Sequence, residues 1–257
     1  MFEWIKRLRK ATKQFTLAPR EEAKQARNQK AINLKPYTPD PKAFLGQVAY
    51  LHLANFEILT AALKLSPHVQ YKAELSEAAA RSFDKYRSLS RALAGIQGTS
   101  DEMSPFRERI DLFHSRTTGI DWYESVIKIY LTAGLLDDFY SRLASGLSDE
   151  LQAEVEKALK DKTFEKFAKR VLTEAIAADP TLGSRLAVWG RRLMGDVLLE
   201  LRAAFDNRKL AHVAKTKTLT VEEESEVNLA AYSKLEPLIS ELTGAHSNRM
   251  DSVGLTA

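Results

Sequence analysis

The stretch KAFLGQVAYLHLANFEILTAALK, residues 42–64, contains one glycine and no proline. Its large apolar side chains recur at three- and four-residue steps, which is the spacing of one face of an α-helix. Pro67 follows, and a proline both ends a helix and is accepted in the first turn of the next one. The stretch therefore predicts a long helix, a tight link and a second helix over residues 68–97. Two apolar sets carry the pattern: Phe44/Val48/Leu51/Ile58 and Leu45/Phe56/Leu59/Leu63.

The rest of the chain continues in long helices. Apolar residues at helical steps predict a third long helix over 121–144 and a fourth over 181–208, and a last helix is expected to begin near Thr220. Residues 98–120 are expected to form a connection with a short helix, and residues 149–179 two short charged helices. No segment shows a convincing period-two alternation, which would indicate a half-buried strand. The prediction is an all-α fold.

The lengths of the connections indicate the architecture. The link between the first and second long helices is tight, whereas residues 98–120 separate the second from the third. A ferritin-like four-helix bundle has one such long crossover, although an up-and-down bundle with decorated loops fits the same helix order. We therefore predict a ferritin-like bundle over residues 36–257, with a helical insertion and an extra C-terminal helix. A basic N-terminal arm, residues 1–35, precedes it.

Composition excludes several classes of protein. Apolar residues make up 44% and charged residues 28% of the 257 residues, a balance that excludes general disorder and an integral membrane protein. The absence of cysteine excludes disulfides, thiolate metal sites and a cysteine nucleophile. No apolar run reaches the roughly 18 residues of a membrane-spanning helix. The first 15 residues lack the apolar core of a signal peptide, and we expect a cytoplasmic protein.

Positive charge is concentrated in the N-terminal arm. Residues 1–35 hold ten basic and three acidic residues, a net charge of +7, which leaves −3 for the rest of the chain. Phe2, Ile5, Leu8 and Phe15 fall near helical spacing beside these basic residues. Such a helix could lie on an anionic membrane surface, follow the phosphates of tRNA, or dock on the protein's own bundle. The candidate binding residues are Lys6, Arg7, Arg9, Lys10 and Lys13.

Five short stretches together resemble a known family. They are LHLANFE (51–57), PFRERIDLFHSR (105–116), DWYE (121–124), DDFY (137–140) and LAVWGRR (186–192). Together they resemble actinobacterial ferritin-like proteins that are grouped with the tRNA hydroxylases acting on methylthio-isopentenyl adenosine. The resemblance covers most of residues 40–210. It implies a non-haem di-iron monooxygenase that uses O₂ on a nucleoside side chain of tRNA.

The residues can be compared with the ligands that di-iron chemistry needs. Bundles of this kind usually take one Glu from each of two helices and a Glu-x-x-His from each of the other two. The chain has no Glu-x-x-His, and Asp111-x-x-His114, the nearest match, lies in the predicted crossover. If the first two helices pair about Pro67, Glu57 lies level with position 76, so we expect a carboxylate of the second helix within about 6 Å of it. The third long helix has two mid-helix acids, Asp137 and Asp138. The candidate metal ligands are Glu57, Glu74, Glu77, Asp138 and His114.

Two interpretations of these residues stay open. In a lapsed metal site, Arg191 or Arg192 neutralises Glu57 and Glu77, since an unpaired buried carboxylate is costly. The protein is then a metal-free scaffold or interaction protein, with the arm or a bundle face as its contact. In a functional site, the carboxylates and a histidine bind two iron ions, and the protein is an O₂-dependent hydroxylase whose arm helps to hold tRNA. A homo-oligomer fits either interpretation. His52 is interpreted as a core or boundary histidine rather than a ligand.

Overall fold

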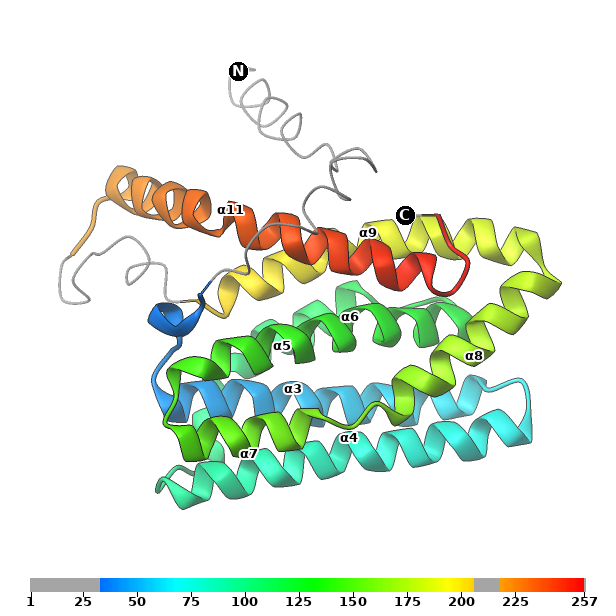
Figure 1. Cartoon of the computed structure of the whole chain (residues 1–257), viewed down its shortest axis with the longest axis horizontal. Coiled ribbons are helices and arrows are strands. Elements are labelled where there is room, and N and C mark those ends of the chain that lie inside the picture. The colour runs from blue at the N-terminus through cyan, green and yellow to red at the C-terminus, as the bar shows by residue number, and fades with distance from the viewer. Residues whose placement is uncertain (1–32, 206–217, 257) are drawn as a thin grey trace.

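The structure, a computed structural model, describes residues 33–205 and 218–256. Within these residues every regular element is a helix, so the prediction of an all-α fold is confirmed (Figure 1). Four short 3₁₀-helices lie between the longer ones: η1 (Lys35–Tyr37), η2 (Leu63–Leu65), η3 (Ser100–Met103) and η4 (Ala144–Gly146). The α-helices are α3 (Pro41–Ala62), α4 (Val69–Gly95), α5 (Ser104–Arg116), α6 (Trp122–Leu143), α7 (Asp149–Leu159), α8 (Thr163–Ala178), α9 (Pro180–Ala203) and α11 (Val221–Asp251).

Capping residues set several helix starts. The side chain of Asp40 accepts a hydrogen bond from the backbone N–H of Lys42, and Pro41 takes the first position of α3. Asp121 accepts from the backbone N–H of Glu124 at the start of α6. Such side chains satisfy backbone donors that the first turn of a helix leaves without a partner. The first and third long helices therefore begin next to their predicted starts.

The helix α6 lies in the middle of the molecule. It packs against α3 and α9, and α8 and α11 also contact it (Figure 1). Most of its side chains are accordingly buried, as expected for a helix that is surrounded by others. The α3–α4 pair, joined through η2, forms one side of the molecule, and α9 with α11 forms the opposite side. The core therefore runs along α6 between these two pairs.

Two shorter helices also build the core, which the prediction of four core helices did not include. α5, inside the predicted crossover, packs against α3 and α9. α8, inside the predicted insertion, packs against α4, α6 and α9, and it runs obliquely across the molecule in Figure 1. Both helices bury large apolar residues, such as Ile110 in α5 and Phe167 in α8. More helices than the predicted four therefore build the interior, since α7 and α11 also add buried residues to it, such as Val155 and Leu238.

A glycine sets how closely α3 approaches the crossover. A Cβ atom added at Gly46 would lie 2.3 Å from the carbonyl oxygen of Glu102 in η3, well inside van der Waals contact. Glycine removes that atom and allows the two backbones to meet. The single glycine in the first long helix is thus explained by packing.

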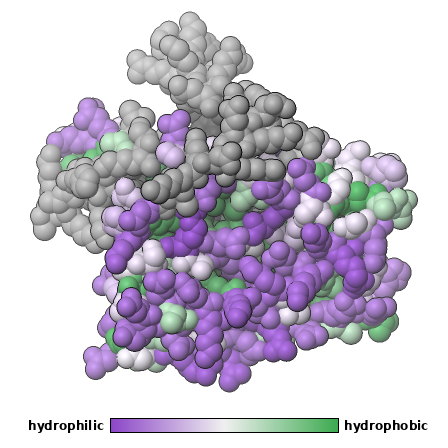
Figure 2. Space-filling model, in the orientation of Figure 1, coloured by the Kyte–Doolittle hydropathy of each residue, from purple (hydrophilic) through white to green (hydrophobic). Residues whose placement is uncertain are grey.

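The segment Pro41–Leu65 is, among the described residues, the one helix long and apolar enough to cross a membrane by length and composition. In the fold it is packed against α4, α5 and α6. It also buries the polar side chains of Gln47, His52 and Asn55. Its apolar composition therefore matches its place in the core. Figure 2 shows hydrophilic residues over most of the visible surface outside the grey region.

Candidate functional site

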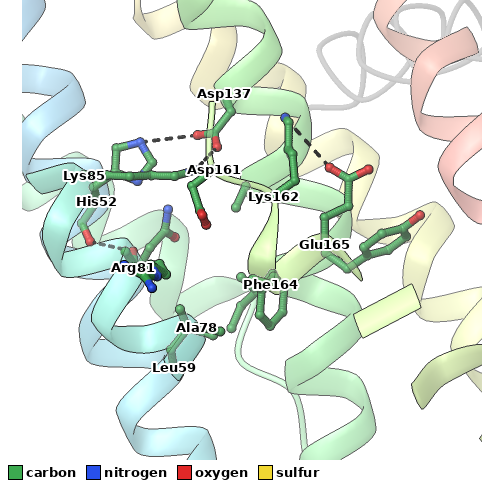
Figure 3. Close-up of a pocket in the computed structure, with 16 residues that line it drawn as sticks. His52, Leu59, Ala78, Arg81, Lys85, Asp137, Asp161, Lys162, Phe164 and Glu165 are labelled. Carbon is green, nitrogen blue, oxygen red and sulfur yellow. Dashed lines mark hydrogen bonds and ion pairs between the residues drawn. The ribbon is translucent and has the colours of Figure 1, made fainter. Parts of the chain in front are cut away.

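A small polar cavity lies inside the bundle, between α3, α4, α6 and the start of α8 (Figure 3). Its volume is about 50 Å³. Three helices each contribute a titratable side chain to it: His52 from α3, Lys85 from α4 and Asp137 from α6. We call these three residues the interior cluster.

Asp137 is the centre of the interior cluster. Its Oδ2 lies 2.6 Å from Nζ of Lys85, and its Oδ1 lies 3.3 Å from Nε2 of His52. The side chains of Asp137 and His52 are 7% and 2% exposed, so water screens their charges little. The aspartate thus has a cation on one oxygen and an imidazole on the other (Figure 3).

These contacts set the protonation of the interior cluster. Burial would raise the pKa of Asp137, but the charges and hydrogen bonds of Lys85 and His52 outweigh burial and hold that pKa below its usual value. Burial lowers the pKa of His52; Asp137 opposes this shift and Lys85 adds to it. At neutral pH the cluster therefore consists of an aspartate anion, a lysine cation and a neutral histidine.

The position of Lys85 is the signal that sequence reasoning missed. Ala78, Ser82, Lys85 and Leu89 follow one another at steps of four, three and four residues, and such steps keep to one face of a helix. Ala78, Ser82 and Leu89 are buried, and the Ser82 hydroxyl donates to the carbonyl of His52 at 3.1 Å. A lysine inside a buried stripe indicates an anion facing it.

Asn55 adds a further polar group to the cavity. Its side chain is buried, and its Nδ2 has no hydrogen-bond partner within the described residues. Leaving a buried amide N–H without a partner is costly. A cavity of this size and polarity can hold a water molecule or a group of similar size. Asn55 therefore gives the cavity a donor for such a guest.

The predicted carboxylate pair of the first two long helices is wrong. Glu57 on α3 and Glu77 on α4 are both exposed. Five residues separate Glu57 from His52, and five residues turn a helix by roughly 140° from its starting face. Glu57 therefore points away from the face that lines the cavity. Glu57 thus lies level with the cavity, as predicted, but on a different face of α3.

The other acidic candidates pair with bases near the surface. Asp138 follows Asp137 directly, and one residue turns the helix by about 100°, so its side chain leaves the interior. The pairs are Glu74 with Arg170 at 2.6 Å, Glu77 with Arg81 at 3.7 Å, and Asp138 with Lys162 at 3.4 Å and with Arg249.

The predicted partners of these carboxylates, Arg191 and Arg192, bind elsewhere. The Arg191 guanidinium donates to the carbonyl of Thr256 at 2.7 Å, which ties the C-terminal segment to α9. The Arg192 guanidinium lies 5.3 Å from the ring centre of Trp189. The base found in the interior cluster is Lys85, and the acid that it pairs with is Asp137.

His114, the predicted ligand in the crossover, lies in a second buried cluster. It is buried on α5, and its Nδ1 is 3.2 Å from Nζ of Lys128 on α6. Asp111, three residues before His114 in the nearest match to a Glu-x-x-His motif, instead accepts a hydrogen bond from the Tyr50 hydroxyl at 2.7 Å near the surface. Burial lowers the pKa of Lys128 to about 7, and burial followed by Lys128 lowers the pKa of His114. His114 is thus not brought near the predicted carboxylates.

The buried carboxylates decide whether the interior can hold metal ions. Three carboxylates are buried in the described part of the chain, and each is paired with a base: Glu124 with Arg185 at 2.8 Å, Asp137 with Lys85 at 2.6 Å, and Glu200 with Arg109 at 2.8 Å. In that part no three His, Asp or Glu side chains are grouped so that they could hold a metal ion. Two iron ions need several carboxylates and imidazoles that are free to bind them. The donor set of this interior does not fit a di-iron centre.

The family of the chain follows from fold and comparison together. The family model of the ferritin-like domain of actinomycetes matches residues 37–216. The chain therefore belongs to this ferritin-like family, and the all-α, ferritin-like fold predicted from the sequence is confirmed. The match begins where the arm ends and leaves α11 outside it. No curated protein matches the chain.

The basic residues of the arm, Lys6, Arg7, Arg9, Lys10 and Lys13, lie outside the described residues.

Proposed function

We propose that this protein is a metal-free member of the ferritin-like family that acts by binding a partner rather than by di-iron chemistry. One observation carries the proposal: each buried carboxylate in the described residues is paired with a lysine or arginine of another helix. A base at hydrogen-bond distance already supplies the positive charge that a metal ion would bring. The ammonium of Lys85 also repels a cation near Asp137.

The other candidate function is the one that the family resemblance implies, an O₂-dependent di-iron hydroxylase acting on tRNA. It would require Lys85 to leave Asp137, and further carboxylates, such as Asp161 and Glu165 of the cavity lining, to join Asp137 as ligands. The cavity offers one buried carboxylate and one imidazole, Asp137 and His52. The contacts of the interior cluster therefore favour the metal-free proposal.

Iron content separates the two functions. The full chain is reconstituted anaerobically with Fe²⁺, desalted and measured for iron. We expect no retained iron, whereas a di-iron enzyme retains about two ions per chain. Two retained ions per chain would overturn the proposal.

A pair of variants makes the same test sharper. Lys85→Glu removes the ammonium and sets a third ligand beside His52 and Asp137, so we expect it to bind about one Zn²⁺ per chain. Arg81→Glu is the matched control, because Arg81 lines the same cavity but does not contact Asp137. It makes the same change of charge and should bind no metal. If the unmodified chain and Lys85→Glu bound Zn²⁺ equally, the Lys85 ammonium would not be what prevents metal binding.

A further inference from the structure

An apolar groove lies on the outside of the bundle. It has a volume of about 260 Å³ and lies between the C-terminal half of α9 and the middle of α11, which run side by side in opposite directions (Figure 1). Apart from Arg202, its lining residues are apolar. Six of them define what we call the α9–α11 groove: Gly195, Leu199, Phe205, Leu235, Leu238 and Leu242.

The groove leaves apolar surface in contact with water. The side chain of Leu199, on its rim, is 59% exposed, whereas the residues of its floor, such as Phe205 and Leu238, are buried. Removing such surface from water is favourable and is the general driving force for docking. The described residues leave this surface uncovered.

We propose that the N-terminal arm docks in the α9–α11 groove through its apolar residues Phe2, Ile5 and Leu8. The first argument is where the arm joins the bundle. Leu34, 2% exposed, belongs to the same hydrophobic cluster as Phe205 and Leu238. The Tyr37 ring contacts the Phe205 ring edge-on, with 6.3 Å between their centres. The described chain thus begins beside the end of the groove.

The length of the arm also fits the groove. A helix over residues 2–15 would be about 20 Å long, and the part of α9 from Gly195 to its end at Ala203 is about 12 Å long. Residues 16–32 can span up to about 60 Å when extended. The arm is therefore long enough to return along the groove from its attachment at residue 33.

The N-terminal arm and the helix α11 carry opposite charges. The segment 1–35 has a net charge of +7. The helix α11, which forms one wall of the groove, carries seven acidic and two basic residues, a net charge of −5. Opposite charges favour the encounter, and a tether of this kind gives an effective concentration on the order of millimolar. Weak apolar contacts therefore suffice for docking.

The inference adds to the proposed function and does not depend on it. A docked arm covers the α9–α11 groove from within the chain, so an outside partner must displace the arm to reach it. Metal content tests the interior cluster, whereas arm position tests the groove. Either proposal can therefore be overturned while the other holds.

The position of the arm can be measured because the chain has no cysteine. Spin labels are attached to the full chain carrying Lys6→Cys and Arg192→Cys, and their separation is measured by double electron–electron resonance. Arg192 is exposed on α9, three residues before Gly195. We expect one narrow distribution of short distances. A broad distribution would overturn the proposal.

Two variants provide the control. Leu199→Glu places a charge in the groove and should broaden the distribution. Val188→Glu makes the same change at another exposed apolar position of α9, outside the groove lining, and should leave it narrow. Equal broadening by both would overturn the proposal. Loss of the short distance on dilution with unlabelled protein would assign the groove to the arm of a second copy, and would overturn it as well.

Discussion

The described part of the chain holds two pairs of lysine and histidine between its helices, and the pairs differ in one respect. His52 and Lys85 share Asp137, whereas His114 and Lys128 contact each other without a carboxylate in the described residues. Lys128 Nζ lies 3.2 Å from His114 Nδ1 and 3.3 Å from the His114 carbonyl oxygen. Glu124, one turn earlier on α6, is held by Arg185.

The difference shows how one acidic residue changes the role of a buried lysine. With Asp137, the ammonium of Lys85 is part of a compensated ion pair, and the pKa of Asp137 is held below its usual value. Without an acid, burial lowers the pKa of Lys128 to about 7, so Lys128 opposes folding whenever it is charged. The same residue type is therefore expected to stabilise one cluster and to destabilise the other.

The largest effect is expected for Asp137→Asn. It leaves the Lys85 ammonium buried without a counter-ion, and breaking a buried ion pair in this way lowers the free energy of unfolding by about 3–5 kcal/mol. Chemical denaturation at pH 7 measures it. Asp138→Asn is the matched control at the next residue, where the side chain is half exposed, and should change stability little. Similar losses for both would contradict the special role of Asp137.

The next prediction compares one substitution at both lysines. Lys85→Met removes the partner of Asp137 and should destabilise the fold by about 2 kcal/mol, because His52 compensates only in part. Lys128→Met removes a buried amine that has no acid and should stabilise the fold by about 1–2 kcal/mol. The His114 carbonyl keeps its bond from the Thr118 hydroxyl. Thermal unfolding of both variants gives the sign of each change in stability. If both changes had the same sign, the two lysines would not differ in the way proposed.

The last prediction is the pH dependence caused by Lys128, which between pH 7 and 9 amounts to about 2 kcal/mol. Its pKa is about 7 in the folded chain against 10.5 normally, so the unfolded chain binds more protons between these values. The stability contributed by Lys128 therefore rises as pH increases from 7 to 10.5, by up to about 1.4 kcal/mol per pH unit. The advantage of Lys128→Met should shrink between pH 7 and 9 in denaturation experiments. A constant difference would mean that Lys128 keeps an ordinary pKa.

The interior cluster shows how far the sequence could lead. Helical spacing identified α3, α4, α6 and α9, and Asp137 was already a candidate from its position in the middle of its helix. The partner of Asp137 was not identified. Apolar spacing shows which face of a helix is buried, but it does not show which face of another helix packs against it. Glu57 was misplaced for the same reason, being level with the cavity but turned away from it.

The amino-acid sequence by itself determined that the chain is helical, because apolar spacing, capping residues and breakers act within a few neighbouring residues. It also excluded thiolate chemistry, since there is no cysteine, and a regular Glu-x-x-His ligand set. Only the tertiary structure decided that α5 and α8 share the core and that Lys85 faces Asp137 across 52 residues of sequence. Such contacts depend on how helices rotate and cross when they pack, and local sequence does not specify that rotation.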